Sequence, residues 1–268
     1  MQGRSETHAP PDTVDELELP PGVVVAHATM KQVYRMAARL GRADIAVLVT
    51  GETGTGKEHV AEAIHQASRR RRAGMVTLNC AALNTGLIES QLFGHTAGAF
   101  SGALRAQPGL IEAASESTLF LDEVGELAPN AQAKLLRVLQ SQHVRRLGAV
   151  HEQPVNVRIV AATNRDLTGE VEAGAFRADL YYRLAASTLW VPPLRERMED
   201  IVPLTEHFLM SAAREMGRTT PKLSDDALEV LRFHAWPGNV RELRNVIHYL
   251  VATVPDDQRQ LLLPVDDN

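Results

Sequence analysis

The sequence has one cysteine, no long apolar run and no excess of positive charge, and each lack excludes a class of protein. Cys80 alone can form neither an internal disulfide nor a cysteine-rich zinc site, which excludes a disulfide-stapled secreted scaffold and a zinc finger. Apolar runs such as residues 45–49 fall far short of the roughly 20 residues that a membrane helix needs. The net charge of −5 argues against a chain whose main task is to neutralise nucleic-acid phosphates.

Two polar segments of the chain carry no signal for a buried core. Residues 1–22 are polar and rich in proline and show no hydrophobic period, which predicts a flexible leader. They carry acids and prolines where a secretory signal would carry basic and then apolar residues, so we expect a cytoplasmic protein without a membrane partner. The four arginines at 69–72 follow a helical pattern and are interpreted as a solvated helix end rather than a nucleic-acid contact.

The hydrophobic pattern predicts an α/β fold followed by helices. Apolar residues within 27–40 recur at helical spacing, which predicts a helix with Gly41 as its C-cap. Five short apolar runs then alternate with helical stretches, at 45–49, 75–79, 117–122, 155–163 and 187–191. Buried runs separated by helices are typical of a parallel sheet covered on both faces, so we predict an α/β nucleotide-binding subdomain over residues 23–192. Three helical patterns, near 199–216, 224–234 and 239–252, predict a small all-α subdomain over 193–255 and a tail over 256–268.

The segment GETGTGKE directly follows the apolar run at 45–49 and precedes a helical stretch. In this context glycines let the chain bend until backbone N–H groups point inward, and the helix N-terminus adds partial positive charge. Lys57 is expected to reach the β- and γ-phosphates of a nucleotide. The next residue is Glu58, where Ser or Thr would place a hydroxyl on Mg²⁺, so an aspartate elsewhere must serve the metal. The predicted cofactor-binding residues here are Gly51, Glu52, Thr53, Gly54, Thr55, Gly56, Lys57 and Glu58.

That aspartate is available in STLFLDEVGE, an apolar run that ends in two acids. An acid at the end of a buried strand beside a phosphate loop can hold Mg²⁺ through its hydration shell, and the next carboxylate can polarise an attacking water. We therefore predict Asp122 as the metal residue and Glu123 as the catalytic residue. A solvated strand end is the alternative.

The segment LFGHTAGAFSGA, at 92–103, sets one aromatic residue among glycines and alanines. Such a segment is too small and flexible to pack as an ordinary helix and unusually apolar for a loop. It indicates a mobile tip that presents Phe100 to a partner, with a buried turn as the alternative. The predicted partner-binding residues are Gly98, Ala99, Phe100, Ser101, Gly102 and Ala103.

This segment resembles the GAFTGA loop of the bacterial enhancer-binding proteins, the AAA+ ATPases that activate sigma-54 RNA polymerase. The resemblance extends over roughly residues 23–252, because LNCAAL, TLFLDEVGE, AATNRDL, FRADLYYRL, PPLRER and WPGNVREL resemble further family signatures in the expected order. It implies a AAA+ P-loop NTPase fold, hydrolysis of ATP with Mg²⁺, self-association into a hexameric ring, and sigma-54 factor with its RNA polymerase as partner. Glutamate after the loop lysine is usual in the family, whereas Ser101 stands where threonine is usual.

The resemblance also implies roles for single residues. Asn79 is similar to the asparagine that restrains the catalytic glutamate and couples nucleotide state to the loop. Thr163 and Asn164 resemble sensor I, which lies where it can detect the γ-phosphate. Arg177 and Arg183 resemble arginine fingers that enter the neighbouring subunit's site, which requires an oligomer.

Two further segments are similar to family elements. Arg241 resembles sensor II, with Asn239 as the expected N-cap of its helix and Glu242 three residues on. Residues 141–158 resemble the family's second insertion, a hairpin that we expect to transmit movement to the Phe100 loop.

Two other functions stay open at this point: a AAA+ ATPase that acts on a different client, and a non-hydrolysing regulator that forms mixed rings with a full-length activator. The chain shows no sensory domain before residue 23 and leaves no room after about residue 254 for a helix-turn-helix, so we expect no direct DNA-binding domain. An excised central domain and a natural chain of this length both fit.

Overall fold

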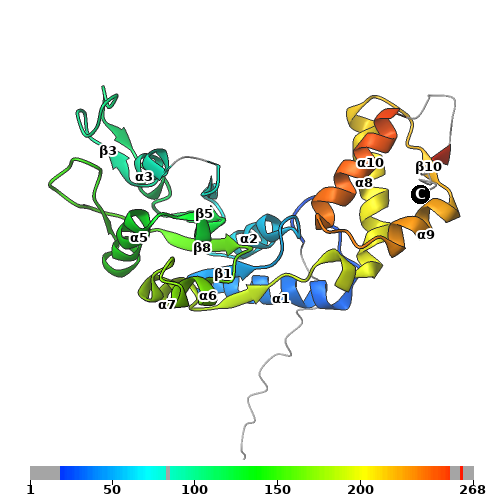
Figure 1. Ribbon diagram of the computed structural model, residues 1–268, viewed down its shortest axis with the longest axis horizontal. Helices are drawn as coiled ribbons and strands as arrows, with labels where there is room; N and C mark the ends of the chain where they lie inside the picture. Colours follow the sequence, from blue (N-terminus) through cyan, green and yellow to red (C-terminus); the bar gives the residue numbers. More distant parts are fainter. Residues whose placement is uncertain (1–18, 83–84, 254–259, 262–268) are drawn as a thin grey trace, which may run out of the picture.

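The computed structural model describes residues 19–82, 85–253 and 260–261, which form an α/β part and a helical part (Figure 1). Most of the predicted leader and tail lies outside the described residues. At the end of the leader, Leu19 packs against the core beneath α1 (Ala28–Arg42), together with Val23 and Val25. No helix among the described residues has the length and apolar character needed to cross a membrane.

A five-stranded parallel sheet forms the centre of the α/β part, in the order β2-β5-β8-β1-β9. All five predicted strands are confirmed: β1 (Val47–Thr50), β2 (Val76–Asn79), β5 (Thr118–Asp122), β8 (Arg158–Thr163) and β9 (Thr188–Trp190). Because the strands are parallel, their carboxyl ends meet at one edge, which is where open α/β sheets bind ligands.

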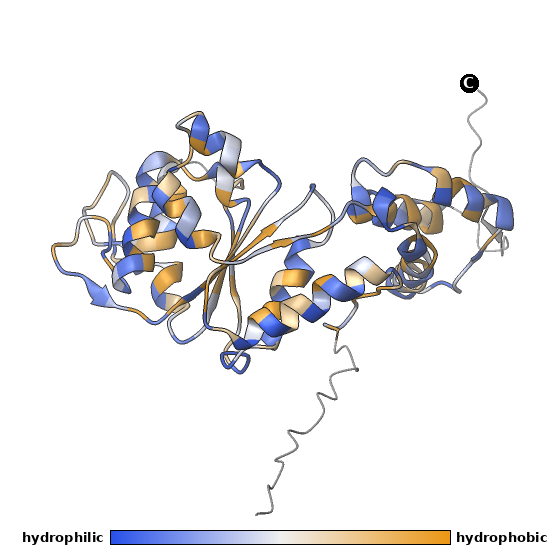
Figure 2. Cartoon of the chain, turned by 90° about the horizontal axis from the view of Figure 1, so that it is seen from below, coloured by the Kyte–Doolittle hydropathy of each residue, from blue (hydrophilic) through white to orange (hydrophobic). Residues whose placement is uncertain are grey.

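Helices cover both faces of this sheet, as predicted. Successive side chains of β1 point to opposite faces, so Val47 and Val49 belong to one core and Leu48 to the other. The first core packs against α1 and α2 (Lys57–Gln66). The second packs mainly against α3 (Thr85–Phe93), α4 (Leu110–Ala113), α5 (Pro129–Ser141) and α7 (Ala178–Leu184), with α6 (Leu167–Glu172) alongside. Figure 2 shows hydrophobic and hydrophilic residues alternating along the helical ribbons of the chain.

Gly41 does not cap the first helix. It lies inside α1, which continues to Arg42, and is buried where α1 meets α2. A Cβ at Gly41 would lie 2.5 Å from the Cβ of Ala67 and 2.6 Å from the carbonyl oxygen of Ile64. The glycine therefore permits a close approach of the two helices. In the sequence it resembles a C-cap, because the pattern does not show this tertiary contact.

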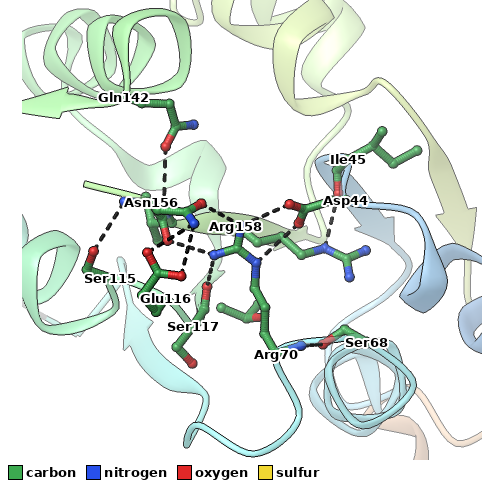
Figure 3. Close-up of polar contacts among 12 residues, drawn as sticks. Asp44, Ile45, Ser68, Arg70, Ser115, Glu116, Ser117, Gln142, Asn156 and Arg158 are labelled. Atoms are coloured by element: carbon green, nitrogen blue, oxygen red, sulfur yellow. Dashed lines mark hydrogen bonds and ion pairs between the residues drawn. The ribbon is translucent and has the colours of Figure 1, made fainter. Parts of the chain in front are cut away.

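The interpretation of the arginines at 69–72 as a solvated helix end is wrong for Arg70, which lies in the turn after α2 and joins the segments that precede β1, β5 and β8 at the amino-terminal edge of the sheet (Figure 3). Its guanidinium donates to both carboxylate oxygens of Asp44, at 2.9 and 3.2 Å, and to the backbone and side-chain oxygens of Asn156, each at 2.7 Å. The nearby Arg158 is buried and donates to carbonyl oxygens at the end of α1. These contacts close the edge of the sheet opposite the phosphate loop.

Two antiparallel hairpins project from the α/β part. The first pairs β3 (Gly94–His95) with β4 (Gln107–Pro108), and the second pairs β6 (His143–Val144) with β7 (Gln153–Pro154). The second confirms the hairpin expected within 141–158. A bridge between His95 and Leu147 joins the two.

The helical part contains η2 (Leu194–Glu196), η3 (Met198–Asp200), α8 (Ile201–Glu215), α9 (Asp225–Phe233) and α10 (Asn239–Thr253), which confirms the three predicted helices. Its own core includes the buried Trp236. Besides the predicted helices, one short pair of strands is present: β10 (Lys222–Leu223) pairs in parallel with β11 (Gln260–Leu261), which lies in the expected tail.

Candidate nucleotide-binding site

The phosphate loop runs from the carboxyl end of β1 to the first turn of α2. Gly54 and Gly56 have φ angles of 78° and 96°, in the left-handed region that favours glycine. Gly56 occupies the N-cap position of α2, so the backbone N–H groups of the first turn face the loop. The bent loop in front of a helix N-terminus is the arrangement predicted for binding phosphate.

The Lys57 side chain is buried and folds back onto the loop. Its Nζ donates to the carbonyl oxygens of Gly51, at 2.9 Å, and Glu52, at 3.2 Å, and lies 3.7 Å from Oε1 of Glu123. Burial lowers the pKa of Lys57, while the nearby Glu123 and Asp122 act in the opposite direction. The Lys57 ammonium group therefore has carbonyl and carboxylate partners. An anionic ligand can take their place or bind in addition to them.

Asp122 is the last residue of β5, and Glu123 follows it before the short η1 (Val124–Glu126). Burial raises the pKa of Asp122, against the lowering effect of Lys57. Glu123 adopts a left-handed φ of 52°, which is unfavourable for a residue with a Cβ. The two carboxylates have different partners: Asp122 accepts from the Asn79 amide, and Glu123 lies near Lys57.

A cavity of about 350 Å³ lies between the α/β part and the helical part. It brings together predicted residues from distant segments: Gly54, Gly56, Lys57, Glu58, Asp122, Glu123 and Arg241. The sequence reasoning missed Arg244 and His207, which also line it. Arg244 lies three residues after Arg241 on α10 and so shares its helix face, a spacing that could have indicated it.

The remaining predicted loop residues and the end of β8 do not line this cavity, but they are bonded to one another and to Glu123, which does. The Asn164 side chain donates to Oγ1 of Thr53 at 2.7 Å, and its backbone N–H donates to Oε2 of Glu123 at 3.1 Å. Thr163 is buried, and its carbonyl oxygen accepts from the Gly51 N–H at 3.3 Å. Thr55 is also buried and donates to the Glu52 carbonyl oxygen at 2.8 Å. The end of β8 thus contacts both the phosphate loop and the expected catalytic carboxylate.

Asn79 does not contact the carboxylate that the resemblance implied. Its side-chain amide donates to Oδ2 of Asp122 at 3.1 Å, and its Oδ1 accepts from the Ala81 N–H at 2.9 Å. The pairing follows from register, because Asn79 lies opposite Asp122 in the parallel β2–β5 ladder. In this arrangement Asn79 restrains the Asp122 carboxylate, and the Glu123 carboxylate is bonded by the Asn164 N–H.

The predicted N-cap role of Asn239 is wrong. Its side chain turns away from α10 and bonds Glu52, Thr53 and the Leu194 N–H. The N-terminus of α10 is served instead by Glu242, whose Oε2 accepts from the Gly238 N–H at 2.7 Å. Packing between the two parts of the chain, which a sequence pattern does not show, redirects Asn239.

The two expected arginine fingers lie outside this cavity. Arg177 is paired with Asp179 at 2.8 Å, and Arg183 donates to the Leu139 carbonyl oxygen at 3.3 Å. Both side chains come from the region of α7, which packs against α5. A role in a neighbouring subunit's site stays a prediction for both residues.

The Phe100 loop lies at the end of the first hairpin. Five of its six predicted partner residues are exposed or half-buried, whereas Ala103 is buried and its carbonyl oxygen closes the loop by accepting from the Gly98 N–H at 2.8 Å. Phe100 is 46% exposed and makes an edge contact with His95. Beneath it, the Thr96 N–H donates to the Leu147 carbonyl oxygen at 3.0 Å, which ties the loop to the second hairpin.

The residues fit a nucleotide with Mg²⁺ better than a metal alone. Among the described residues, no group of three or more His, Cys, Asp or Glu side chains is arranged to hold a metal ion. Mg²⁺ commonly keeps several waters and binds through one or two carboxylates and the substrate's phosphates, a requirement that Asp122 beside the phosphate loop can meet.

Comparison with known proteins identifies the family. Residues 23–190 match the family described as the sigma-54 interaction domain, and residues 195–262 match the AAA+ ATPase lid domain. The chain belongs to the sigma-54 interaction domain family. The sigma-54 interaction domain is thus followed here by its lid, and the α/β and helical parts described above correspond to the two matches.

Relatives of this sigma-54 interaction domain are longer proteins. The chain is 52% identical over 226 residues to the Nif-specific regulatory protein of Azotobacter vinelandii, covering 84% of this chain and 43% of that protein. It is 47% identical over 230 residues to the DNA-binding transcriptional regulator NtrC of Rhizobium meliloti (strain 1021), covering 86% of this chain and 47% of that protein. The chain spans less than half the length of these two curated relatives.

A solved structure of a related protein carries a nucleotide. NtrX from Brucella abortus in complex with ATP superposes with a TM-score of 0.83 at 34% identity, covering 91% of this chain and 55% of that chain. The chain therefore has the fold of a sigma-54-dependent activator's AAA+ domain.

Proposed function

We propose that this chain binds and hydrolyses ATP with Mg²⁺ in a hexameric ring and uses the cycle to drive Phe100 and its loop against sigma-54 factor. The client would be the closed complex of sigma-54 RNA polymerase at a promoter, which remodelling would activate for transcription. One observation carries the proposal: a single cavity gathers Lys57, Asp122, Glu123 and Arg241, while a half-exposed Phe100 is presented at the end of a hairpin of the same subdomain.

In the proposed mechanism each cavity residue has one task. The amides of the phosphate loop and Lys57 bind phosphate oxygens, and Arg241 adds positive charge from the lid. Asp122 would hold Mg²⁺, which neutralises phosphate charge when bound. Glu123 would orient and polarise the attacking water, with its carboxylate held by the Asn164 N–H.

Hydrolysis would also need a neighbouring subunit. Arg177 and Arg183 lie outside the cavity of their own chain, and their guanidinium groups would stabilise charge on the phosphoryl group bound by the next subunit. Assembly into a ring would therefore complete the site rather than merely bring sites together.

Strand β8 offers a route from the nucleotide to the loop. At one end it leads to Asn164, which contacts Glu123 and Thr53; at the other end it follows the second hairpin. That hairpin is bonded to the Phe100 loop through Leu147 and Thr96. A change at Asn164 would thus reach Phe100 through one buried strand and two hydrogen-bonded hairpins.

The test is size-exclusion co-elution of the chain with purified sigma-54 factor, with and without ADP plus aluminium fluoride, which mimics the phosphoryl group in transfer. The proposal expects a complex that forms only with the mimic. A ring that forms with the mimic while sigma-54 factor elutes separately would contradict the proposed partner. Failure of the chain to bind nucleotide or assemble would contradict the proposed ATPase.

A further inference from the structure

The lid makes direct contact with the phosphate loop at three consecutive residues. Arg195, in η2, donates to both carboxylate oxygens of Glu52, at 2.6 and 2.9 Å. Asn239 donates to the carbonyl oxygen of Thr53 at 3.0 Å, and the backbone N–H of Arg241 donates to that of Gly54 at 3.3 Å. Each contact joins segments at least 143 residues apart in the chain.

Asn239 is the centre of this junction. It is fully buried, and its amide bridges three segments: Oδ1 accepts from the Leu194 N–H at 2.7 Å, while Nδ2 donates to the Thr53 carbonyl oxygen and to Oε2 of Glu52 at 3.2 Å. Only a side chain with both an acceptor and donors can make this set of bonds. Its φ of 53° is in the left-handed region, where asparagine is tolerated better than most residues.

The backbones of lid and loop also touch. A Cβ at Gly54 would lie 2.3 Å from the carbonyl oxygen of Gly238, the residue before Asn239. The loop therefore rests directly on the start of α10, and a displacement of α10 cannot leave residues 52–54 unchanged.

Charge adds to the contact. Arg195 and the Asn239 amide hold the pKa of Glu52 at about 2, so this carboxylate stays ionised at neutral pH. An unpaired carboxylate in a loop that binds phosphate would repel its ligand. Pairing with Arg195 offsets that charge and turns the side chain toward the lid.

We propose that Asn239 and Arg195 are positioning residues through which the helical lid holds residues 52–54 of the phosphate loop in the geometry that binds ATP. This inference rests on the proposed function, because it concerns the same nucleotide site. Neither side chain lines the cavity itself, so each acts through the loop rather than on the ligand.

The test measures the affinity of the full chain for a fluorescent ATP analogue. Asn239→Asp removes both donors and places a second carboxylate beside Glu52, and Arg195→Ala removes the ion pair from a half-exposed position where the fold should persist. We expect each variant to bind about tenfold more weakly, the effect of losing a hydrogen bond to a charged or buried group. In steady-state turnover, KM should rise more than kcat falls.

The matched control is Arg70→Ala, which removes a comparable pair with Asp44 at the opposite edge of the sheet (Figure 3). It should lower the thermal unfolding midpoint yet leave nucleotide affinity unchanged, which separates positioning from loss of stability. Wild-type affinity in both Asn239→Asp and Arg195→Ala would overturn the inference. Failure of the unaltered chain to bind more tightly than Lys57→Ala would instead overturn the proposed ATPase.

Discussion

The backbone N–H of Asn164 donates to the Glu123 carboxylate at 3.1 Å, while the side chain of the same asparagine donates to Thr53 of the phosphate loop at 2.7 Å. One residue at the end of β8 therefore contacts both the segment that would bind phosphate and the acid that would act on water. The contact also fixes the carboxylate of a residue with left-handed backbone geometry. This relationship underlies the first prediction.

Glu123→Ala should retain ATP binding and lose turnover. The loop amides remain when this carboxylate is removed, and Lys57 keeps its two carbonyl partners, Gly51 and Glu52. Activation of water by a positioned base, in contrast, contributes roughly 10²–10⁴-fold to rate. Phosphate release and binding of a fluorescent ATP analogue measure the two effects separately. Loss of binding equal to the loss of turnover would contradict its role in activating water.

Arg183→Ala should abolish hydrolysis in pure rings, with a loss of about 10³-fold or more, as for other arginine fingers. Mixing with Glu123→Ala subunits should restore part of the activity, because some junctions would then combine an intact Glu123 with an intact Arg183 from the neighbour. Turnover is measured across a series of mixing ratios. No recovery at any ratio would count against a finger acting between subunits.

Phe100→Ala should leave ATP turnover largely intact and remove nucleotide-dependent binding to sigma-54 factor. Phe100 lies outside the nucleotide cavity and is 46% exposed, so its removal takes away contact area without disturbing the core. Val150→Ala is the control, since Val150 is an 84% exposed apolar residue of the neighbouring hairpin. Unchanged binding by Phe100→Ala in the co-elution assay would refute the contact.

Gly148→Ala should separate the two hairpins and weaken sigma-54 binding while ATP turnover persists. A Cβ there would lie 2.7 Å from Oγ1 of Thr96 and 2.9 Å from the Cβ of Ala99. Gly174→Ala is matched for backbone conformation, with φ of 74° against 76°, but meets nothing within 4 Å. Both variants should lose about 1 kcal/mol of stability, because alanine is strained in the left-handed region; urea unfolding measures this loss. If the two variants bound sigma-54 equally well, coupling through this contact would be contradicted.

Cys80 should be almost inert in the native protein. Burial raises the pKa of its thiol to about 12, so at pH 8 only about one thiol in ten thousand would be ionised. Because the thiolate is the reactive form and its fraction grows with pH below the pKa, labelling by Ellman's reagent should be slow at pH 8 and complete rapidly in urea. As the chain has one cysteine, the released thiolate reports this site alone. Rapid labelling without denaturant would show that β2 opens more readily than its burial implies.

The sequence by itself determined where strands and helices alternate along the chain, the position of the phosphate loop and the acid pair at the end of β5. These features depend on local rules: alternation of apolar runs with helices, glycines before a helix, and acids at the end of a buried strand. The five strands of the central sheet and the three α-helices of the lid could be predicted because hydrophobic period is a short-range signal.

Only the tertiary structure decided which partners the polar side chains take. Gly41 serves a helix contact, Arg70 closes a sheet edge, and Asn239 joins the lid to the phosphate loop. Each of these contacts joins segments that are separated in the chain, and it is set by how the elements pack, because hydrogen bonds act only over about 3 Å. Local sequence determines which donors and acceptors a side chain carries, and packing determines which groups they bond.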